Sequence, residues 1–307
     1  MDFRDVSLTA LRVFRAVAEQ GTFTAAAVSL GYTQSAVSRQ MASLERAAGT
    51  TLLDRRREGV RLTPAGHLVL RRATTVLDEI DRTARELSGL PDRAGTVRVG
   101  WPPNSGAVLL PRALTALRAS HPAITVTSRE GSTPALVRAL RSGGIDLALL
   151  SSTPPYRPLD AESPSLVTET LTERSLCLAL PASHPLARGA YVDIADLRGQ
   201  RWIAGPAAGE DRLMGVWPGL DERPVIAHTA RDWLAKLHLV AAGCGLTTVP
   251  ASLAPAAPDG VAIRPVRGGA QEQRRLLLAR LPTPPDDAVS RVADALRTAA
   301  RATDTAL

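Results

Sequence analysis

The side chains with the clearest chemistry lie in one short stretch near the amino end. From Gln34 onward apolar residues recur at helical spacing, and the opposite face carries four hydrogen-bonding residues: Gln34, Ser35, Ser38 and Arg39. A glutamine amide can pair with adenine, an arginine can pair with guanine or grip a phosphate, and serine lets the backbone approach closely. The helix N-terminus, which Thr33 can cap, favours phosphate. This face therefore predicts contact with duplex DNA, including through Thr33; the alternative is a solvated polar face.

Arginines gather just after this stretch. In residues 52–66 four arginines surround Gly59, after which Val60 and Leu62 alternate with a polar residue, and Arg55, Arg56 and Arg57 precede that glycine. Two short strands joined at a glycine form a wing, whose basic tip can grip phosphates or enter the minor groove. We therefore add Arg55, Arg56 and Arg57 to the predicted DNA contacts. For each single arginine the alternative is a solvated loop.

Elsewhere the sequence offers little for catalysis or for a metal. The five histidines are scattered without ligand spacing, and Cys177 sits in an apolar run typical of a buried strand. Gly243 and Gly245 lack the third glycine of a dinucleotide-binding turn. No nucleophile or acid–base pair is evident. We therefore predict a protein that is not an enzyme and that carries no metal and no cofactor.

Two short helices must precede and position the polar face. Ser7 can cap a helix that ends at Gly21, and Thr22 or Thr24 can cap a second helix that runs to Leu30. The first helix places four apolar residues on one stripe: Leu8, Leu11, Phe14 and Ala18. A short glycine-containing turn then leads into the helix with the polar face. This order is the helix-turn-helix pattern.

A long helical pattern follows over residues 67–88. Its apolar residues recur at alternating spacings of three and four, and they form this seam: Leu70, Ala73, Leu77, Ile80, Ala84 and Leu87. A narrow seam flanked by charged residues is typical of helix pairing, so we predict a homodimer held by this helix. The alternative is that the seam packs on the same chain's own domain.

Composition sets the remaining bounds. The chain has 307 residues, of which 45% are hydrophobic and 22% charged, and this fits about two globular domains. Its formal net charge of +7, from 37 basic and 30 acidic residues, suits a phosphate-bearing partner. The sequence shows no signal-peptide pattern, no apolar run long enough to span a membrane and only two cysteines. We therefore expect a cytoplasmic protein with no membrane partner.

The N-terminal motifs together resemble the LysR-type transcriptional regulators. The stretches that carry the resemblance are residues 7–19, 21–27, 32–40 and 44–45, Gly49, and the wing end Leu62-Thr63-Pro64-Ala65-Gly66. One departure is Glu58, where the family usually has a second arginine three residues after Arg55. The resemblance implies a mixed fold: an N-terminal all-α winged helix-turn-helix, a long linker helix, and a C-terminal α/β domain of two lobes similar to periplasmic binding proteins. It also implies a tetramer built from two dimers.

The C-terminal two hundred residues support the α/β part of this expectation. Buried strand patterns at 96–101, 124–127 and 145–150 are separated by helical patterns. That order implies a parallel sheet with right-handed crossovers. A run of chain breakers at 89–95 separates this part from the long helix.

We therefore divide the chain into three parts. These are a DNA-binding domain, a dimerisation or linker helix with a hinge, and an effector-binding domain, over residues 1–66, 67–95 and 96–307. By the resemblance, lobe 1 takes about 96–165 and 267–307, and lobe 2 about 166–266. Two crossings between the lobes form a hinge, and the cleft between them is a natural site for a small molecule.

Effector contacts are expected beyond the carboxyl ends of strands, where helix N-termini point. The candidates from both lobes are Asn104, Ser105, Ser132, Thr133, Ser151, Ser152, Gly205, Pro206 and Cys244. Their hydroxyls and backbone amides suit a small polar effector that carries a carboxylate. For Ser105 and Ser132 the alternative is an ordinary helix cap.

Together these patterns predict a transcription regulator that a small-molecule effector controls. Its expected partners are double-stranded promoter DNA, the effector, and further copies in a homodimer or homotetramer, with RNA polymerase as a further candidate. Two other classes compete. A solute-binding receptor or an enzyme would use the N-terminal domain only to dimerise, and an architectural DNA-binding protein would bind no effector.

Overall fold

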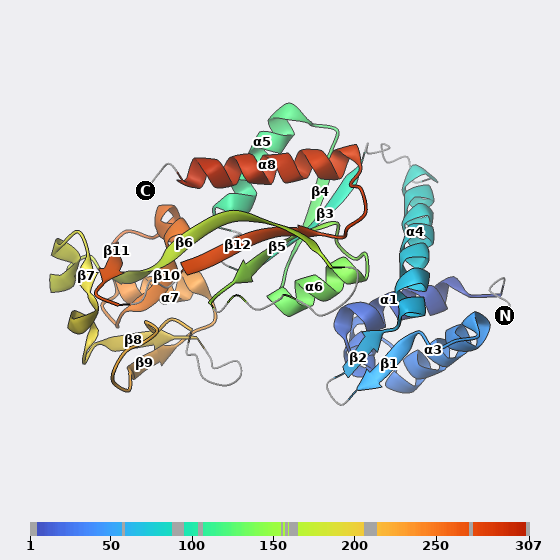
Figure 1. Ribbon diagram of the computed structural model, residues 1–307, viewed down its shortest axis with the longest axis horizontal. Helices are drawn as coiled ribbons and strands as arrows, with labels where there is room; N and C mark the ends of the chain where they lie inside the picture. Colours follow the sequence, from blue (N-terminus) through green and yellow to red (C-terminus); the bar gives the residue numbers. More distant parts are fainter. Residues whose placement is uncertain are drawn as a thin grey trace.

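The computed structural model describes residues 5–56, 59–87, 95–103, 107–154, 156, 159, 165–205, 214–269 and 273–304. It consists of a head, formed by three short helices, a two-stranded wing and one long helix, and of an α/β body with two lobes. This arrangement confirms the mixed fold that the sequence predicts. The head and lobe 2 lie at opposite ends of the molecule, with lobe 1 between them (Figure 1).

Local capping defines the three helices of the head. They are α1 (Leu8–Gln20), α2 (Phe23–Leu30) and α3 (Gln34–Ala48). The side-chain oxygens of Ser7, Thr22 and Thr33 each accept a hydrogen bond from the backbone N–H three residues on, at 3.1, 3.1 and 3.2 Å. Each helix ends at a glycine of positive φ. Of the predicted apolar stripe, Leu11, Phe14 and Ala18 are buried, whereas Leu8 is 38% exposed at the first turn.

The wing and the long helix complete the head. Strands β1 (Leu53–Arg56) and β2 (Gly59–Leu62) pair antiparallel, and α4 runs over Pro64–Leu87. In α4 the first three residues of the predicted dimer seam are buried in the core of the head: Leu70, Ala73 and Leu77.

This burial corrects the prediction that all six seam residues serve a partner. Of the other three, Ile80 is half-buried, Ala84 is exposed, and the side chain of Leu87 lies outside the described part. A head of three short helices has little apolar surface of its own, so α4 turns its seam inward to close the core. For Leu70, Ala73 and Leu77 the structure therefore supports the alternative of packing on the chain's own domain.

Lobe 1 is a sheet with helices on both faces. Its elements are β3 (Thr96–Trp101), α5 (Leu109–Ser120), β4 (Thr125–Glu130), α6 (Thr133–Arg141), β5 (Leu147–Ser152), β12 (Gln273–Arg280) and α8 (Asp287–Asp304). Strand β3 pairs in parallel with β4 and with β5, as the alternation of strands and helices predicts. Helices α5 and α8 share one apolar core with the sheet, and α6 packs in another.

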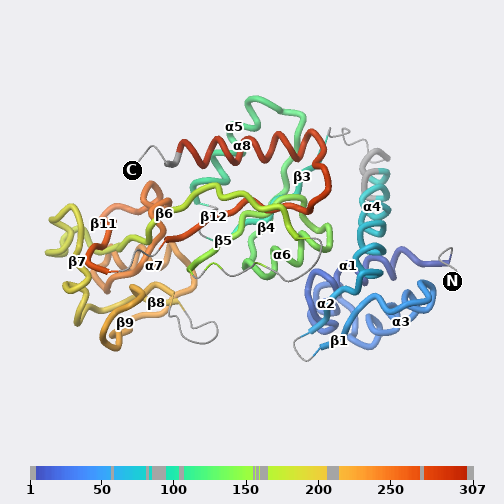
Figure 2. The backbone as a smooth tube through the Cα atoms, in the orientation of Figure 1, coloured from blue at the N-terminus to red at the C-terminus, as the bar shows by residue number. Residues whose placement is uncertain are grey.

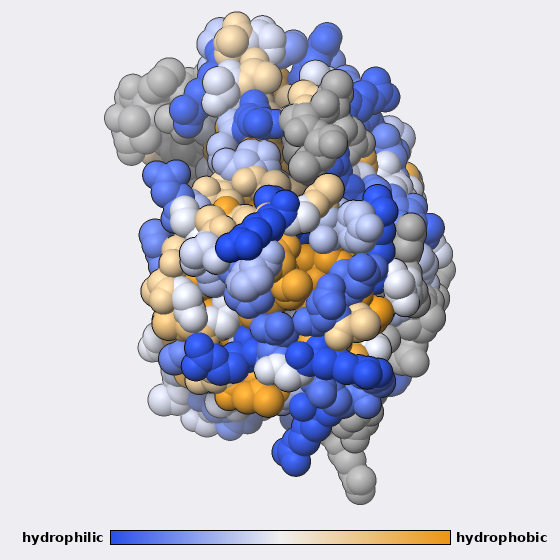
Figure 3. All heavy atoms as spheres, turned by 90° about the vertical axis from the view of Figure 1, so that its left-hand side faces the viewer, coloured by the Kyte–Doolittle hydropathy of each residue, from blue (hydrophilic) through white to orange (hydrophobic). Residues whose placement is uncertain are grey.

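Lobe 2 is a smaller α/β unit. Its elements are β6 (Val167–Pro181), η1 (Pro185–Arg188), β7 (Val192–Asp193), η2 (Ile194–Leu197), β8 (Arg201–Ala204), β9 (Val225–Thr229), α7 (Trp233–Ala241), β10 (Thr247–Pro250), η3 (Ala251–Ala256) and β11 (Val261–Arg267). Strands β8 and β9 pair in parallel. Figure 3 views the lobe 2 end of the molecule, where hydrophilic side chains surround a central strip of apolar ones.

The lobes are joined by one long strand. The first part of β6, from Val167 to Ser175, pairs with β12 of lobe 1, and its end pairs with β10 and β11. The chain enters lobe 2 along β6 and returns through β11 and β12, as the trace in Figure 2 shows. The cleft between the lobes is therefore bounded by strands that belong to both.

The described residues contain neither a membrane-spanning helix nor a cluster of metal-binding side chains. None of the helices there combines the length and the apolar character needed to cross a membrane. The same residues hold no group of three or more histidine, cysteine or acidic side chains that could bind a metal ion.

Candidate nucleic-acid interface and ligand cleft

The exposed face of α3 carries the predicted DNA-reading residues. Gln34, Ser35 and Arg39 are exposed and Ser38 is half-buried. The opposite face is fixed in the core by Val37, Met41 and Leu44. Because one side of the helix is held by packing, its N-terminal half presents the polar groups in a fixed direction, as a recognition helix requires.

Thr33 contributes to this face mainly as a cap. Its hydroxyl accepts the N–H of Ala36 at 3.2 Å and lies 3.1 Å from the hydroxyl of Ser35. These contacts orient the first turn of α3, whose free N–H groups favour a phosphate. The local role of Thr33 is therefore to cap α3. Its side chain is also exposed, on the same face as the other predicted DNA contacts.

The wing arginines are positioned by neighbours. The Arg55 guanidinium lies 4.7 Å from the centre of the Phe23 ring, a cation–π contact. Arg56 forms an ion pair with Asp54 at 2.9 Å in which both side chains are about half exposed. Arg57 lies outside the described residues. The side chains of at least two wing arginines are therefore held by contacts with neighbouring residues.

The wing is attached to the helices through backbone groups. One carboxylate oxygen of Glu45 accepts the N–H groups of Leu52 and Leu53 at 2.8 and 3.2 Å. The N–H of Val60 donates to the carbonyl of Gly21 at 2.9 Å. These contacts fix the position of the wing relative to α1 and α3, so that both can meet one duplex.

A basic groove beside the wing escaped the sequence reasoning. It is lined by Thr51, Leu53, Asp54, Arg55, Arg56, Arg61, Leu62, Thr63, Pro64, His67 and Arg71. Arg61 lies between two apolar residues of β2 and therefore points away from the core. The alternation of apolar and polar residues in this strand already predicted that orientation. Arg71 lies one helical turn after His67 on α4, and only the fold brings that turn to the wing.

Four of the predicted effector residues come together at the carboxyl edge of the lobe 1 sheet. Ser132 and Thr133 begin α6, and Ser151 and Ser152 end β5. The Thr133 hydroxyl donates to the Ser151 carbonyl at 3.3 Å. The expected cap is absent, because Ser132 precedes α6 without a side-chain capping bond. Its hydroxyl is therefore not committed to the helix.

The lobe 2 candidates do not form one cluster. Gly205 follows the carboxyl end of β8. Cys244 lies at the opposite, amino end, since the N–H of Leu246 bonds to the Arg201 carbonyl where β8 begins. The expectation that Gly205 and Cys244 share an edge is wrong, because the turn at Cys244 leads into a strand instead of following one. Asn104, Ser105 and Pro206 lie outside the described residues.

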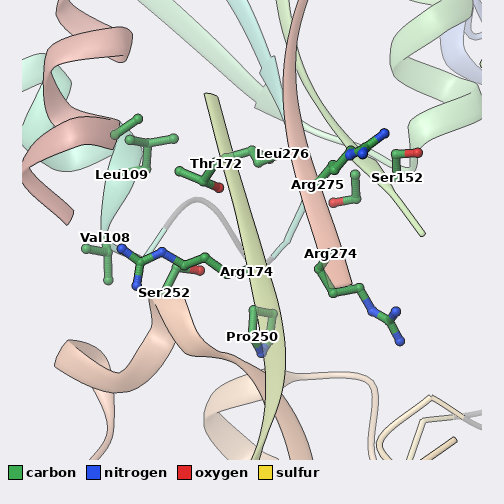
Figure 4. Close-up of a pocket in the computed structure, with 12 residues that line it drawn as sticks. Val108, Leu109, Ser152, Thr172, Arg174, Pro250, Ser252, Arg274, Arg275 and Leu276 are labelled. Carbon is green, nitrogen blue, oxygen red and sulfur yellow. The ribbon is translucent and has the colours of Figure 1, made fainter. Parts of the chain in front are cut away.

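A pocket lies where the two lobes meet. It is lined by Val108, Leu109, Ser151, Ser152, Thr172, Arg174, Pro250, Ser252, Arg274, Arg275, Leu276 and Ala300, most of which Figure 4 labels. These residues come from lobe 1, from the hinge strands and from η3 of lobe 2. The cavity volume is about 60 Å³. A water needs about 10–15 Å³ on such a measure, so a ligand of more than a few heavy atoms requires the lobes to part.

Arginine gives this pocket its charge. Arg174 of β6 and Arg274 of β12 are directly opposed across the strand pair, an arrangement in which like charges repel. Their guanidinium groups extend in different directions in Figure 4. On the other face of the strands Glu173 pairs with Arg275 at 3.0 Å, and its hydrogen bond raises the pKa of that arginine. Both arginines therefore contribute positive charge to the lining of the pocket.

The buried cysteine does not add a reactive group. Cys177 is buried in β6, where burial raises the pKa of its thiol and so disfavours the thiolate. Both cysteines are free. The sequence expectation that Cys177 is a core residue is confirmed by its 8% exposure.

Comparison with protein families matches nearly the whole chain. Residues 8–67 match the family described as bacterial regulatory helix-turn-helix protein, lysR family. Residues 92–301 match the family described as LysR substrate binding domain. The two matches correspond to the head and to the body.

Individual proteins agree with these matches. The transcriptional dual regulator GltC of Bacillus subtilis is 31% identical over 250 residues, covering 80% of this chain and 81% of GltC. The regulator BenM of Acinetobacter baylyi is 30% identical, covering 80% and 81%. Full-length CbnR complexed with its target DNA is 25% identical with a TM-score of 0.51, covering 96% and 99%. A full-length OxyR variant of Pseudomonas aeruginosa shares the fold, at a TM-score of 0.60 and 22% identity, covering 96% and 94%.

Proposed function

This chain belongs to the LysR family of transcriptional regulators, and on that premise we propose which residues carry its two activities. It is a DNA-binding regulator with an effector-binding domain, and it is not an enzyme. We place the boundaries between its DNA-binding domain, linker helix and effector-binding domain at about residues 66 and 95. We propose that it acts in the cytoplasm, where promoter DNA is accessible.

The DNA contacts are Gln34, Ser35, Ser38 and Arg39 of α3, together with the wing arginines. The observation that carries this assignment is the fixed exposed face of α3 behind the Thr33 cap. Gln34 and Arg39 read base edges in the major groove, because their side chains can form paired hydrogen bonds. Arg55 and Arg56 hold the sugar-phosphate backbone or the minor groove beside it.

The effector is a small anion that binds between the lobes. Arg174 and Arg274 supply charge, and the hydroxyls of Ser151, Thr172 and Ser252 supply hydrogen bonds. This assignment replaces much of the predicted set: Ser151 and Ser152 are the members of that set that line the pocket. Ser132 and Thr133 remain at its edge through the bond from Thr133 to Ser151.

The dimer contact is the outer face of α4. Leu68 and Val76 are apolar residues of this helix that stay 51% and 44% exposed. They lie on the side away from Leu70 and Leu77, and Arg72 and Glu79 flank them. A partner that covers this face places two heads on one duplex, with half-sites a whole number of helical turns apart. Tetramer formation and contact with RNA polymerase are further steps that use the same assembly.

A gel-shift assay with the DNA upstream of the protein's own gene tests the DNA assignment. Arg39→Ala removes a base contact worth about 1–3 kcal/mol, so specific affinity should fall roughly fivefold to 150-fold. Arg118→Ala is the charge-matched control, since Arg118 is exposed on α5 in the body. Equal specific affinity of both variants and the unmodified protein would contradict the recognition face.

Sedimentation tests the dimer contact. Leu68→Glu and Val76→Glu place charges on the outer face of α4 and should shift the protein toward monomer at micromolar concentration. Thr115→Glu, at an exposed position on α5, provides the control. If the dimer persists in both α4 variants, the contact lies elsewhere.

A further inference from the structure

Helix α6 contacts both the ligand cleft and the head. At its N-terminal end the Thr133 hydroxyl donates to the carbonyl of the pocket residue Ser151 at 3.3 Å. Toward its C-terminal end the Arg138 guanidinium donates to the carbonyl of Glu19 in α1 at 3.4 Å. Figure 1 shows α6 on the side of lobe 1 that faces the head. A single helix therefore spans the distance between the two regions.

The contact of the head with lobe 1 is polar and extends beyond α6. We call it the head latch and define it by Glu19, Thr74, Arg129, Arg138 and Ser142. The Glu19 carboxylate lies 3.6 Å from the Arg129 guanidinium. The buried hydroxyl of Thr74 donates to the Ser142 carbonyl at 3.0 Å. Because Thr74 belongs to α4, both α1 and α4 of the head are tied to lobe 1.

A second group of charges lies beside the latch. Arg98 of β3 lies 3.3 Å from Asp78 of α4 and 2.9 Å from Asp146 of lobe 1. Arg15 of α1 also reaches Asp78, at 3.5 Å. The head thus presents the carboxylates of Glu19 and Asp78 to arginines of lobe 1. Complementary charges of this kind fix the orientation of two surfaces more than they strengthen their binding.

Lobe 1 has two glycines where the head approaches most closely. A Cβ on Gly144 would lie 2.2 Å from a carboxylate oxygen of Glu19, which is far inside van der Waals contact. A Cβ on Gly143 would lie 3.1 Å from the methyl group of Thr74. Any side chain at Gly144 would therefore push Glu19 away. At both positions the backbone of lobe 1 lies against side chains of the head.

The latch also lies next to the wing. The C-terminal end of α1 contacts α6 on one side, where a Cβ on Gly21 would lie 3.3 Å from the Arg138 guanidinium. On the other side the carbonyl of Gly21 accepts the N–H of Val60 in β2 at 2.9 Å. The contacts therefore run from Ser151 through α6 to the end of α1 and on to the wing.

We propose that α6 and the head latch couple the occupancy of the cleft to the placement of the wing within the same chain. This inference rests on the proposed effector site. A ligand that contacts Ser151 in the cleft displaces the end of β5 and, through the bond from Thr133, the N-terminal end of α6, and α6 carries that displacement to Glu19 and Gly21. Coupling of two sites requires an element with contacts to both, and α6 is such an element.

Disulfide trapping tests the latch. In a background of Cys177→Ala and Cys244→Ser, the pair Thr74→Cys and Gly143→Cys places two thiols across the latch. The Cβ position at Gly143 is 3.4 Å from the Cβ of Thr74, close to the separation of roughly 3.5–4.5 Å in disulfides. Should Gly143→Cys destabilise its turn, Ser142→Cys replaces it.

The control moves one thiol by a single residue. Thr75 is exposed on the neighbouring position of α4, so Thr75→Cys with Gly143→Cys should oxidise at least about tenfold more slowly, as measured by peptide mass spectrometry. Equal rates for the two pairs would overturn the latch. Gly144→Ala in the trapping background should slow the disulfide, because it displaces Glu19.

The coupling is tested by a change in the cleft. Thr133→Val removes the bond to Ser151 and should alter the trapping rate about fivefold or more, whereas Thr115→Val on α5 should leave it unchanged. An unchanged rate with Thr133→Val would overturn the coupling. If the latch responds in this way but no small carboxylate raises the melting temperature, the proposed effector site fails and the latch stands.

Discussion

The head and the ligand cleft reach their function by different routes. In the head, the residues proposed to meet DNA lie on one helix and one hairpin, within a short stretch of chain, and local caps define the helix. In the cleft, Ser151, Arg174 and Arg274 come from strands far apart in sequence, which β12 brings side by side by pairing with β5 and with β6.

This difference affects how each region tolerates change. The DNA-reading face depends on α3 keeping one side packed, and its buried side chains belong to the core of the head alone. The cleft depends on the relative position of two lobes and on hinge strands shared between them. A mutation that leaves a cavity in the core of the head should therefore abolish DNA binding, whereas one in the core of the body should leave DNA binding intact.

The largest expected effect separates the two cores. Leu44 and Leu178 are both almost fully buried, in the head and in lobe 2. Leu44→Ala and Leu178→Ala should each lower the free energy of unfolding of their region by about 3 kcal/mol, since each leaves a cavity. Leu44→Ala should also abolish specific DNA binding, and Leu178→Ala should preserve it.

Urea unfolding and gel shifts measure these two effects. The separation of the regions would be disproved if Leu178→Ala removed DNA binding as completely as Leu44→Ala. Val28→Ala is the control in the head, because Val28 is 79% exposed and its loss leaves no cavity.

A smaller effect tests the charge of the cleft. Arg174→Gln and Arg274→Gln should each weaken the binding of a small carboxylate about tenfold, which corresponds to about 1.4 kcal/mol for one lost charge-assisted contact. Specific DNA affinity without the carboxylate should be unchanged. Calorimetric titration of each variant gives the affinity, and Arg201→Gln, at an exposed position of β8, is the control. Carboxylate binding that both cleft variants retain in full would place the effector elsewhere.

The smallest effect concerns buried charge. Among the described residues, Arg141 and Lys236 are the buried cationic side chains, and both belong to the body. Burial lowers the pKa of Lys236 below its ordinary value of 10.5, and its amine lies 4.8 Å from the centre of the Trp233 ring. Between the lowered folded pKa and 10.5 the unfolded chain binds more protons, so the free energy of unfolding rises with pH through that range.

Lys236→Met should remove this rise and should raise the free energy of unfolding near neutral pH by about 1 kcal/mol, because it replaces a buried ammonium with an apolar chain of similar length. Chemical denaturation at pH 7 and pH 10 measures both quantities. An identical pH dependence in the variant would show that the amine stays solvated in the folded protein.

Prediction from sequence succeeded where structure is local. The bounds of α3 from Gln34 to Ala48 follow from the Thr33 cap, the glycine that ends the helix and the apolar residues that recur at helical spacing. The wing follows from the alternation about Gly59. It failed at Leu70 and Leu77, since a seam with this spacing suits a partner helix and the chain's own core equally well. It failed at Cys244, since a glycine-rich turn does not show which end of a strand it joins.

The sequence by itself determined the helices of the head, their caps and the polar face of α3, because each depends on residues within a turn or two of one another. Only the tertiary structure decided that Arg174 opposes Arg274, that the seam of α4 closes the head, and that α6 connects the cleft with α1. The physical reason is that strand register and helix packing join residues through space, and no local periodicity specifies those neighbours.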